Sequence, residues 1–147
     1  MEPAGRSSGV DVLQSAQREA RVCAARVAGH SGEIELAREV GSAARARSFV
    51  AGTLDGWASR DPDEVITLMT SELVTNAVRY ADGPIVVGVT RIDEHTVRVR
   101  VTDGSPFSPV APKSVPDNEG GRGLRIVDVL ARRWGTQRYE RQKTVWF

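Results

Sequence analysis

The sequence predicts a single α+β domain whose sheet has one face covered by helices and one wetter face. The 147-residue chain fits one domain of ordinary size with a hydrophobic core. Val97, Val99 and Val101 alternate with polar residues, which is typical of a strand that is buried on one face. From Asp61 to Tyr80, apolar residues recur at helical spacing, which predicts an amphipathic helix.

The N-terminal part of the chain is predicted to be an extension of the main domain. Residues 1–9 are rich in Gly, Ser, Pro and Ala and indicate a disordered leader. Residues 10–28 have apolar side chains three or four positions apart, which predicts a helix that Gly29 ends. We therefore expect an extension over residues 1–32 and the main domain over residues 33–147.

The main domain is predicted to alternate helices with strands. Asp61 as N-cap, Pro62 at the first helical position and Glu64 three residues after the cap form the clearest helix start. Proline-rich residues 104–121 predict a long surface loop of the kind that often acts as a functional lid. The expected elements are strand 33–37, helix 40–58, helix 61–80, strands 85–90 and 96–102, a helix with Leu124, Val127, Leu130, Ala131 and Trp134 inward, and strands 136–139 and 143–147.

The composition excludes several classes of protein. Twenty basic and 19 acidic residues leave a formal net charge of +1, which argues against nucleic acid as the main partner. Cys23 is the only cysteine, so no intrachain disulfide can form and a reducing compartment is favoured. No apolar run is long enough to predict a signal peptide or a membrane-spanning helix. We therefore expect a cytoplasmic protein with no membrane partner.

Two polar residues lie on or beside the apolar stripe of the helix predicted from Asp61. With about 100° per residue, Asn76 falls inside the stripe and Glu72 at its edge. Such side chains need a partner, because burying an unpaired carboxylate or amide costs several kcal/mol, on the order of 2–7 for the neutral group. The partner is another protein group, water, or a bound ligand and metal. An amide oxygen suits Mg²⁺, and a nearby carboxylate could orient or deprotonate an attacking hydroxyl.

Asp103, Gly104 and Ser105 follow directly after the alternating strand. The carboxylate of Asp103 could accept a hydrogen bond from an exocyclic amine such as that of adenine. An ordinary turn is the alternative, because Asp-Gly pairs are frequent in turns.

A glycine run, Gly120-Gly121-Arg122-Gly123-Leu124, opens the last predicted helix. Glycines let the backbone approach phosphate closely, and the free N–H groups at the start of a helix attract anions. The run follows a loop instead of a strand, and it lacks the spacing of a phosphate-binding P-loop. A third kind of nucleotide site is therefore indicated.

The order of these motifs resembles the ATPase superfamily of gyrase, histidine kinases and MutL. More narrowly, it resembles the bacterial branch of anti-sigma-factor serine kinases, the RsbW and SpoIIAB type, over about residues 33–147. The resemblance implies a two-layer α/β sandwich of the Bergerat type, with a mixed, mostly antiparallel sheet packed on helices. The segments that carry it are SELVTNAV (71–78), VTDGSP (101–106), GGRGLRIVDVLARRWG (120–135) and KTVW (143–146).

The resemblance implies ATP and Mg²⁺ as cofactors and gives the site residues their roles. It implies Glu72 as the catalytic base, Asn76 as the Mg²⁺ ligand and Asp103 as the residue that binds the adenine amine. Ser105 stands where the broader superfamily has glycine. The other residues expected at the nucleotide are Ser105, Gly121, Arg122, Gly123, Leu124, Lys143 and Thr144.

Two functions remain open at this point. The first is a homodimeric anti-sigma factor that phosphorylates a STAS-type antagonist on serine and otherwise sequesters a sigma factor, as the resemblance implies. The second is a nucleotide-dependent module that binds partners without phosphotransfer. A histidine kinase fragment is disfavoured, because His30 and His95 both fall in predicted turns.

Overall fold

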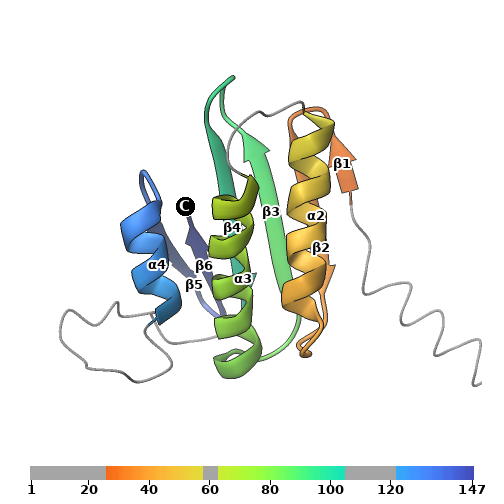
Figure 1. Cartoon of the computed structure of the whole chain (residues 1–147). Helices are drawn as coiled ribbons and strands as arrows, with labels where there is room; N and C mark the ends of the chain where they lie inside the picture. Colours follow the sequence, from red (N-terminus) through yellow and green to blue (C-terminus); the bar gives the residue numbers. More distant parts are fainter. Residues whose placement is uncertain (1–25, 58–62, 105–121) are drawn as a thin grey trace, which may run out of the picture.

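The computed structural model describes residues 26–57, 63–104 and 122–147, which form one sheet and three helices (Figure 1). The chain order begins with a strand pair, continues with two helices and two strands, and closes with a helix and a second strand pair. The elements are β1 (Arg26–Ala28), β2 (Ser31–Leu36), α2 (Ser42–Gly56), α3 (Asp63–Tyr80), β3 (Ile85–Arg91), β4 (Val97–Asp103), α4 (Arg122–Leu130), β5 (Gly135–Tyr139) and β6 (Gln142–Trp146).

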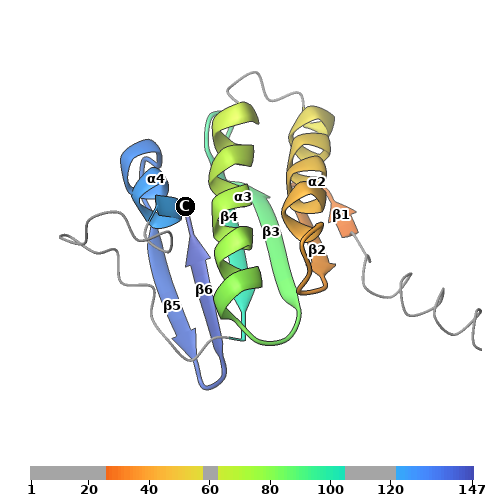
Figure 2. The same cartoon turned by 60° about the horizontal axis from the view of Figure 1, so that its bottom comes forward.

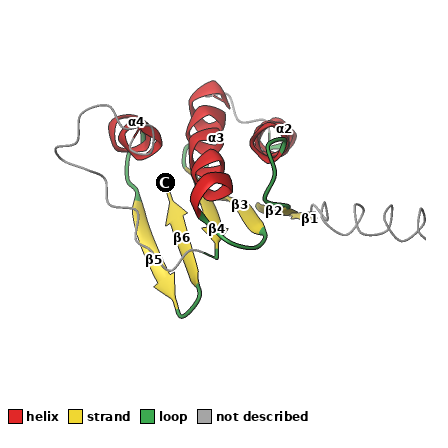
Figure 3. Cartoon of the chain, turned by 90° about the horizontal axis from the view of Figure 1, so that it is seen from below, coloured by secondary structure: helices red, strands yellow, loops and turns green. Residues whose placement is uncertain are grey.

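The six strands lie in the order β1-β2-β3-β4-β6-β5. All three helices cover the same face of this sheet, with α2 over the β1–β2 side, α3 over the centre and α4 over the β5–β6 side (Figures 2 and 3). The predicted two-layer α+β sandwich is therefore confirmed. Every strand pair that the structure describes is antiparallel, so the described sheet contains none of the parallel pairs that a mixed sheet would have.

The alternation in β4 determines which side chains face the helices. Val99 and Val101 are buried beneath the helices together with Asp103, whereas Arg98 and Arg100 are exposed on the other face. Antiparallel register aligns Val101 with valines of both neighbouring strands, which extends the apolar face across the sheet. The open face is polar and includes an ion pair between Arg100 and Glu33 at 3.0 Å.

Helices α2 and α3 bury one side each against this sheet. Ala46, Val50 and Leu54 are spaced four residues apart on α2 and are fully buried. Four-residue spacing places side chains on one helix face, so the α2 sequence specifies which face packs inward. Between the two helices, the Arg47 guanidinium donates a hydrogen bond to Ser71 Oγ at 2.7 Å.

The end of the helix predicted over residues 10–28 is a strand instead. Arg26–Ala28 form β1, which pairs antiparallel with β2 through a turn in which Gly29 has a φ of 57°. A left-handed φ suits glycine, and the resulting hairpin extends the sheet by one strand. Residues 10–25 of the predicted helix lie outside the described residues. The division at residues 32 and 33 stays a prediction, and β2 begins at Ser31.

The last helix is shorter than the sequence pattern predicts. Helix α4 ends at Leu130, which is 44% exposed, so neither Leu130 nor Trp134 belongs to an inward helical stripe. The Trp134 indole instead folds back and donates a hydrogen bond to Asp128 Oδ1 at 2.9 Å. The helical spacing on α3 also predicts an inward position for Tyr80, but this side chain is 60% exposed, whereas the next residue, Ala81, is buried.

The other predicted boundaries agree with the structure to within about two residues. The capping residues Asp61 and Pro62 and the loop over 105–121 lie outside the described part of the chain.

The core packing leads to a stability prediction. Val50→Ala removes two methyl groups from a fully buried site on α2 and should lower the free energy of unfolding by about 2 kcal/mol. Val129→Ala makes the same change on α4 at a side chain that is 74% exposed, so its effect should stay within about 0.5 kcal/mol. Urea denaturation measures both. Equal losses in the two variants would contradict the assignment of the core.

Candidate functional site

Helix α4 begins directly against the middle of helix α3. Gly123, in the first turn of α4, is buried there. A Cβ at this position would lie 2.8 Å from Asn76 Nδ2 and 3.3 Å from Glu72 Cβ. Contacts below about 3.0 Å require something to move, so a larger residue at this position would have to displace the Asn76 amide. The structure therefore brings Gly123 of the glycine run together with both polar residues of α3.

Glu72 and Asn76 are half-buried at this helix contact. Neither side chain forms a hydrogen bond or ion pair with any other residue in the described ranges. The internal core pair that the sequence left open is therefore not found among these residues. Since a partly desolvated polar group is stabilised by a partner, the two side chains are suited to meet a ligand or metal.

The N-terminal end of α4 adds an anion-attracting element. The first N–H groups of an α-helix have no partner within the helix, and they carry the positive end of its dipole. Leu124 and Val127 anchor α4 in the core, so this end of the helix has a fixed position beside α3. Arg122 is the first residue of α4, and Leu124 serves as a core anchor through its buried side chain.

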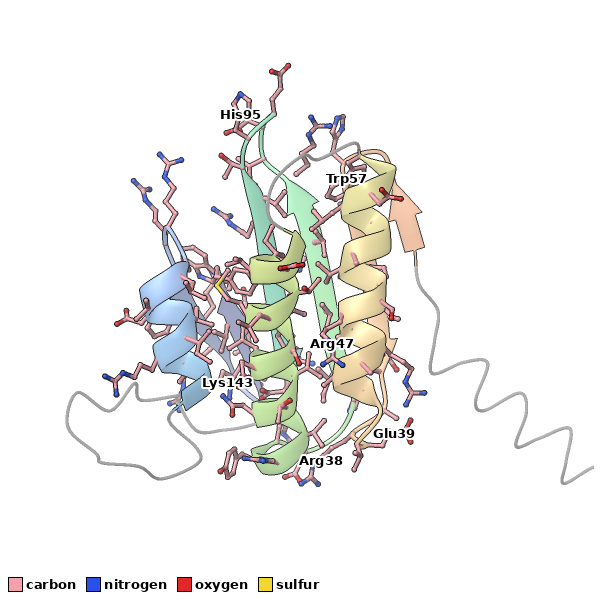
Figure 4. The ribbon with its side chains drawn as sticks, viewed as in Figure 1. Arg38, Glu39, Arg47, Trp57, His95 and Lys143 are labelled. Atoms are coloured by element: carbon pink, nitrogen blue, oxygen red, sulfur yellow. The ribbon has the colours of Figure 1, made fainter. Side chains whose placement is uncertain are left out.

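Asp103 and Lys143 form an ion pair on the helix-covered face of the sheet. They stand opposite each other on β4 and β6, and Lys143 Nζ lies 3.3 Å from Asp103 Oδ2. The side chains are only 4% and 12% exposed, respectively. In Figure 4, Lys143 lies between α3 and α4. Register thus places a carboxylate and an ammonium group at the same end of the domain as the helix contact.

Gly104 fixes the end of β4 to the loop that follows α3. Its N–H donates a hydrogen bond to the carbonyl of Asp82 at 3.2 Å, and a Cβ would collide with that carbonyl. A backbone atom cannot move aside without a large cost, so position 104 requires glycine because of this contact and not only because Asp-Gly pairs form turns. This contact ties Asp103 to the helix that carries Glu72 and Asn76.

The side chain of Thr144 does not lie on the same face of the sheet as that of Lys143. Neighbouring residues in a strand point to opposite faces, and Thr144 Oγ1 lies 2.7 Å from Thr102 Oγ1 on the face away from the helices. Ser105 and Gly121 lie outside the described residues, and no side-chain contact of Arg122 is described. On the helix-covered side, Gly123 therefore lies against Glu72 and Asn76, and Asp103 pairs with Lys143.

Most of the chain matches a known protein family. The model of the histidine kinase-like ATPase domain matches residues 11–147. The chain belongs to this family. The match begins upstream of the described strands and includes residues that the sequence analysis assigned to the extension. Among proteins with curated descriptions, none matches the chain.

Membership in the histidine kinase-like ATPase family supports ATP as the ligand of this site. The side chains present also fit a magnesium nucleotide. Mg²⁺ prefers oxygen ligands, keeps several waters and usually takes only one or two protein ligands beside phosphates. The amide oxygen of Asn76 provides one such ligand. A cluster of three or more His, Cys, Asp or Glu side chains that could hold a metal alone is absent from the described residues.

Two further observations bear on the sequence predictions. His30 lies in the β1–β2 turn and His95 in the β3–β4 hairpin, both exposed, as predicted. None of the described helices is long and apolar enough to cross a membrane.

Two contacts of the candidate site have no signal in the sequence. The sequence pattern indicates Asp103 and Lys143 separately but not their pairing, which depends on the register of β4 against β6. The contact of Gly104 with Asp82 joins residues 22 positions apart in the chain. The sequence contains both segments, residues 82–84 and Asp103-Gly104, but no pattern in it indicates that they are in contact.

Gly123→Ala should weaken nucleotide binding without unfolding the domain. The new methyl group would displace the Asn76 amide, and we expect about a tenfold loss of Mg·ATP affinity, within the range for losing one polar contact. Gly52→Ala, on the exposed side of α2, meets nothing within 4 Å and should leave affinity unchanged. Isothermal titration calorimetry compares them. Wild-type affinity in Gly123→Ala would show that this contact does not position the site.

The ion pair makes a separate prediction about stability. Asp103→Asn leaves the nearly buried Lys143 ammonium without its counter-charge, which should cost about 3 kcal/mol or more. Lys143→Met should relieve part of this loss in the double variant, because the two residues are coupled. Urea denaturation of both single variants and the double variant gives the coupling energy. Losses that simply add would refute the coupling.

Proposed function

We propose that this protein is an ATP-dependent anti-sigma factor that phosphorylates a serine of an anti-sigma-factor antagonist. Family membership supports nucleotide binding, and the finer assignment rests on Glu72 standing one turn before Asn76 on α3. Neither side chain has a protein partner in the described residues, and both face the start of α4. This arrangement is the single observation that carries the proposal.

The proposed roles follow from side-chain chemistry. Asn76 would hold Mg²⁺, which supplies charge neutralisation on the phosphates when bound. The start of α4 would hold the phosphate oxygens through its free N–H groups. Asp103 would accept a hydrogen bond from the adenine amine, and the neighbouring Lys143 keeps that carboxylate fixed.

Glu72 would act as the general base. One helical turn separates Glu72 from Asn76, about 6 Å along the axis, which suits a base that receives the proton of a serine hydroxyl near the terminal phosphate. The serine oxygen would form a bond to the terminal phosphorus as the bridging oxygen bond breaks. The products are a phosphoserine and ADP, and the proton remains on Glu72 before it passes to water.

The proposed partners are a STAS-type antagonist and a sigma factor, bound by a cytoplasmic homodimer. The resemblance of the SELVTNAV and GGRGL segments to the anti-sigma-factor branch supports these partners. If nucleotide binding is retained without any transfer, the protein is instead a nucleotide-dependent partner-binding module.

Two substitutions separate binding from transfer. Asn76→Ala should weaken Mg·ATP binding by about 1–3 kcal/mol, because its amide partners are lost. Glu72→Gln should keep Mg·ATP affinity but reduce phosphorylation of an antagonist at least about a hundredfold, because a neutral amide cannot accept the proton. Calorimetry measures the first, and transfer of labelled phosphate to purified antagonist proteins measures the second.

Glu64→Gln, at an exposed position on the same helix, is the matched control and should change neither quantity. Unchanged Mg·ATP affinity in Asn76→Ala would contradict the assignment of the nucleotide site. A wild-type protein that binds Mg·ATP but labels no antagonist would leave the nucleotide site standing and refute the kinase assignment.

A further inference from the structure

A cavity lies at the opposite end of the helix layer from the proposed nucleotide site. Its volume is about 790 Å³, and it is lined by the first turns of α3, the β3–β4 hairpin, the end of α4 and the end of β6. Along α3 its lining ends at Met69, seven residues before Asn76, which corresponds to about 10 Å. Figure 4 shows the separation, with His95 beside the cavity at the top and Lys143 far below it.

The floor of this cavity is apolar. Met69 and Phe147 form part of it and are themselves almost fully buried. Ile92 of the hairpin and Leu130 of α4 flank it and are 49% and 44% exposed, although most large apolar side chains of the described residues are buried. A hollow with exposed apolar walls and a polar rim is typical of a protein-binding surface.

The rim of the cavity is cationic. Four arginine and two acidic side chains line it, which gives a formal side-chain charge of 4 − 2 = +2. The backbone N–H of His95 donates a hydrogen bond to Asp93 and lowers the pKa of that carboxyl, which keeps it ionised. Arg98 lies over the Trp146 ring at 5.0 Å. In contrast, Arg132 and Arg133 are exposed, and no ion pair or hydrogen bond to either is found among the residues that the structure describes. The four arginines are Arg91, Arg98, Arg132 and Arg133.

We infer that this cavity is the docking site for an acidic segment of a partner protein that carries apolar side chains. The apolar side chains would enter between Ile92 and Leu130, and the carboxylates would meet Arg132 and Arg133. Arginine beside a desolvated apolar pocket is the typical composition of an energetic hot spot, and opposite charge at the rim favours the correct partner.

The charges also argue against two other occupants. Residues 1–25 of this chain contain three acidic and three basic residues, so they offer no net charge to match the rim, and they lead into β1 at the far edge of the sheet. A second copy in a twofold contact would bring the same arginines towards each other. An acidic partner is the complementary choice.

The test uses the full chain and a fluorescein-labelled acidic peptide of about 16 residues, roughly four helical turns, with leucines at helical spacing among glutamates. A matched peptide has glutamine in place of every glutamate. Fluorescence anisotropy should show micromolar binding of the acidic peptide, at least about tenfold weaker binding of the neutral one, and weakening by added salt.

Matched variants locate the binding. Leu130→Ser should weaken binding at least about fivefold, whereas Val129→Ser, at the neighbouring exposed position outside the cavity, should not change it. Arg132→Glu with Arg133→Glu should weaken it at least about tenfold. Arg79→Glu with Arg141→Glu makes the same change in net charge, from +1 to 1 − 4 = −3, outside the cavity and should have a clearly smaller effect.

Several outcomes would overturn the inference. These are equal binding of both peptides, equal effects of Leu130→Ser and Val129→Ser, and binding only of a small aromatic sulfonate dye that competes with no peptide. Sedimentation that shows a dimer dissociated by Leu130→Ser would assign the cavity to a second copy instead. Mg·ATP affinity should stay at the wild-type value in the Leu130 and Arg132/Arg133 variants, so the cavity and the nucleotide site can fail independently.

Discussion

The close contact between Gly123 and the Glu72–Asn76 side of α3 is the constraint on which the rest of the site depends. A larger residue at position 123 would displace the Asn76 amide and crowd Glu72, so the two polar side chains could not keep their present positions beside the start of α4. Leu124 and Val127 hold α4 in this position by packing into the core. Gly123 therefore lets α4 come close to α3, and the buried side chains of Leu124 and Val127 fix its position there.

The antiparallel sheet contributes the other half of the site through its register. Pairing of β4 with β6 puts Asp103 opposite Lys143 on the covered face and Thr102 opposite Thr144 on the open face. A shift of one residue would exchange these faces, because side chains alternate along a strand. The same four elements, α3, α4, β4 and β6, also border the cavity at their other ends. As we propose, one scaffold thus offers a nucleotide site at one end and a partner surface at the other.

Much of the fold was predictable because burial leaves a periodic pattern in the sequence. The alternation of Val97, Val99 and Val101 and the helical spacing on α3 correctly indicated elements and inward faces. The errors fall at element ends, where periodicity is replaced by local contacts. Trp134 leaves the helix because its indole can reach Asp128, and Arg26–Ala28 form a strand because β2 offers them a pairing edge. Neither contact has a signal in the local sequence.

The sequence by itself determined the chemical types of the site residues and their order along the chain. An amide and a carboxylate one helical turn apart, followed by Asp-Gly and a glycine-opened helix, limit the site to a few kinds of ligand. Only the tertiary structure decided which of these residues meet. It united Gly123 with Asn76 and Asp103 with Lys143, turned Thr144 to the other face, and formed a cavity from Ile92 and Leu130. The reason is physical: periodicity records whether a side chain is buried, whereas register and helix packing determine what it is buried against.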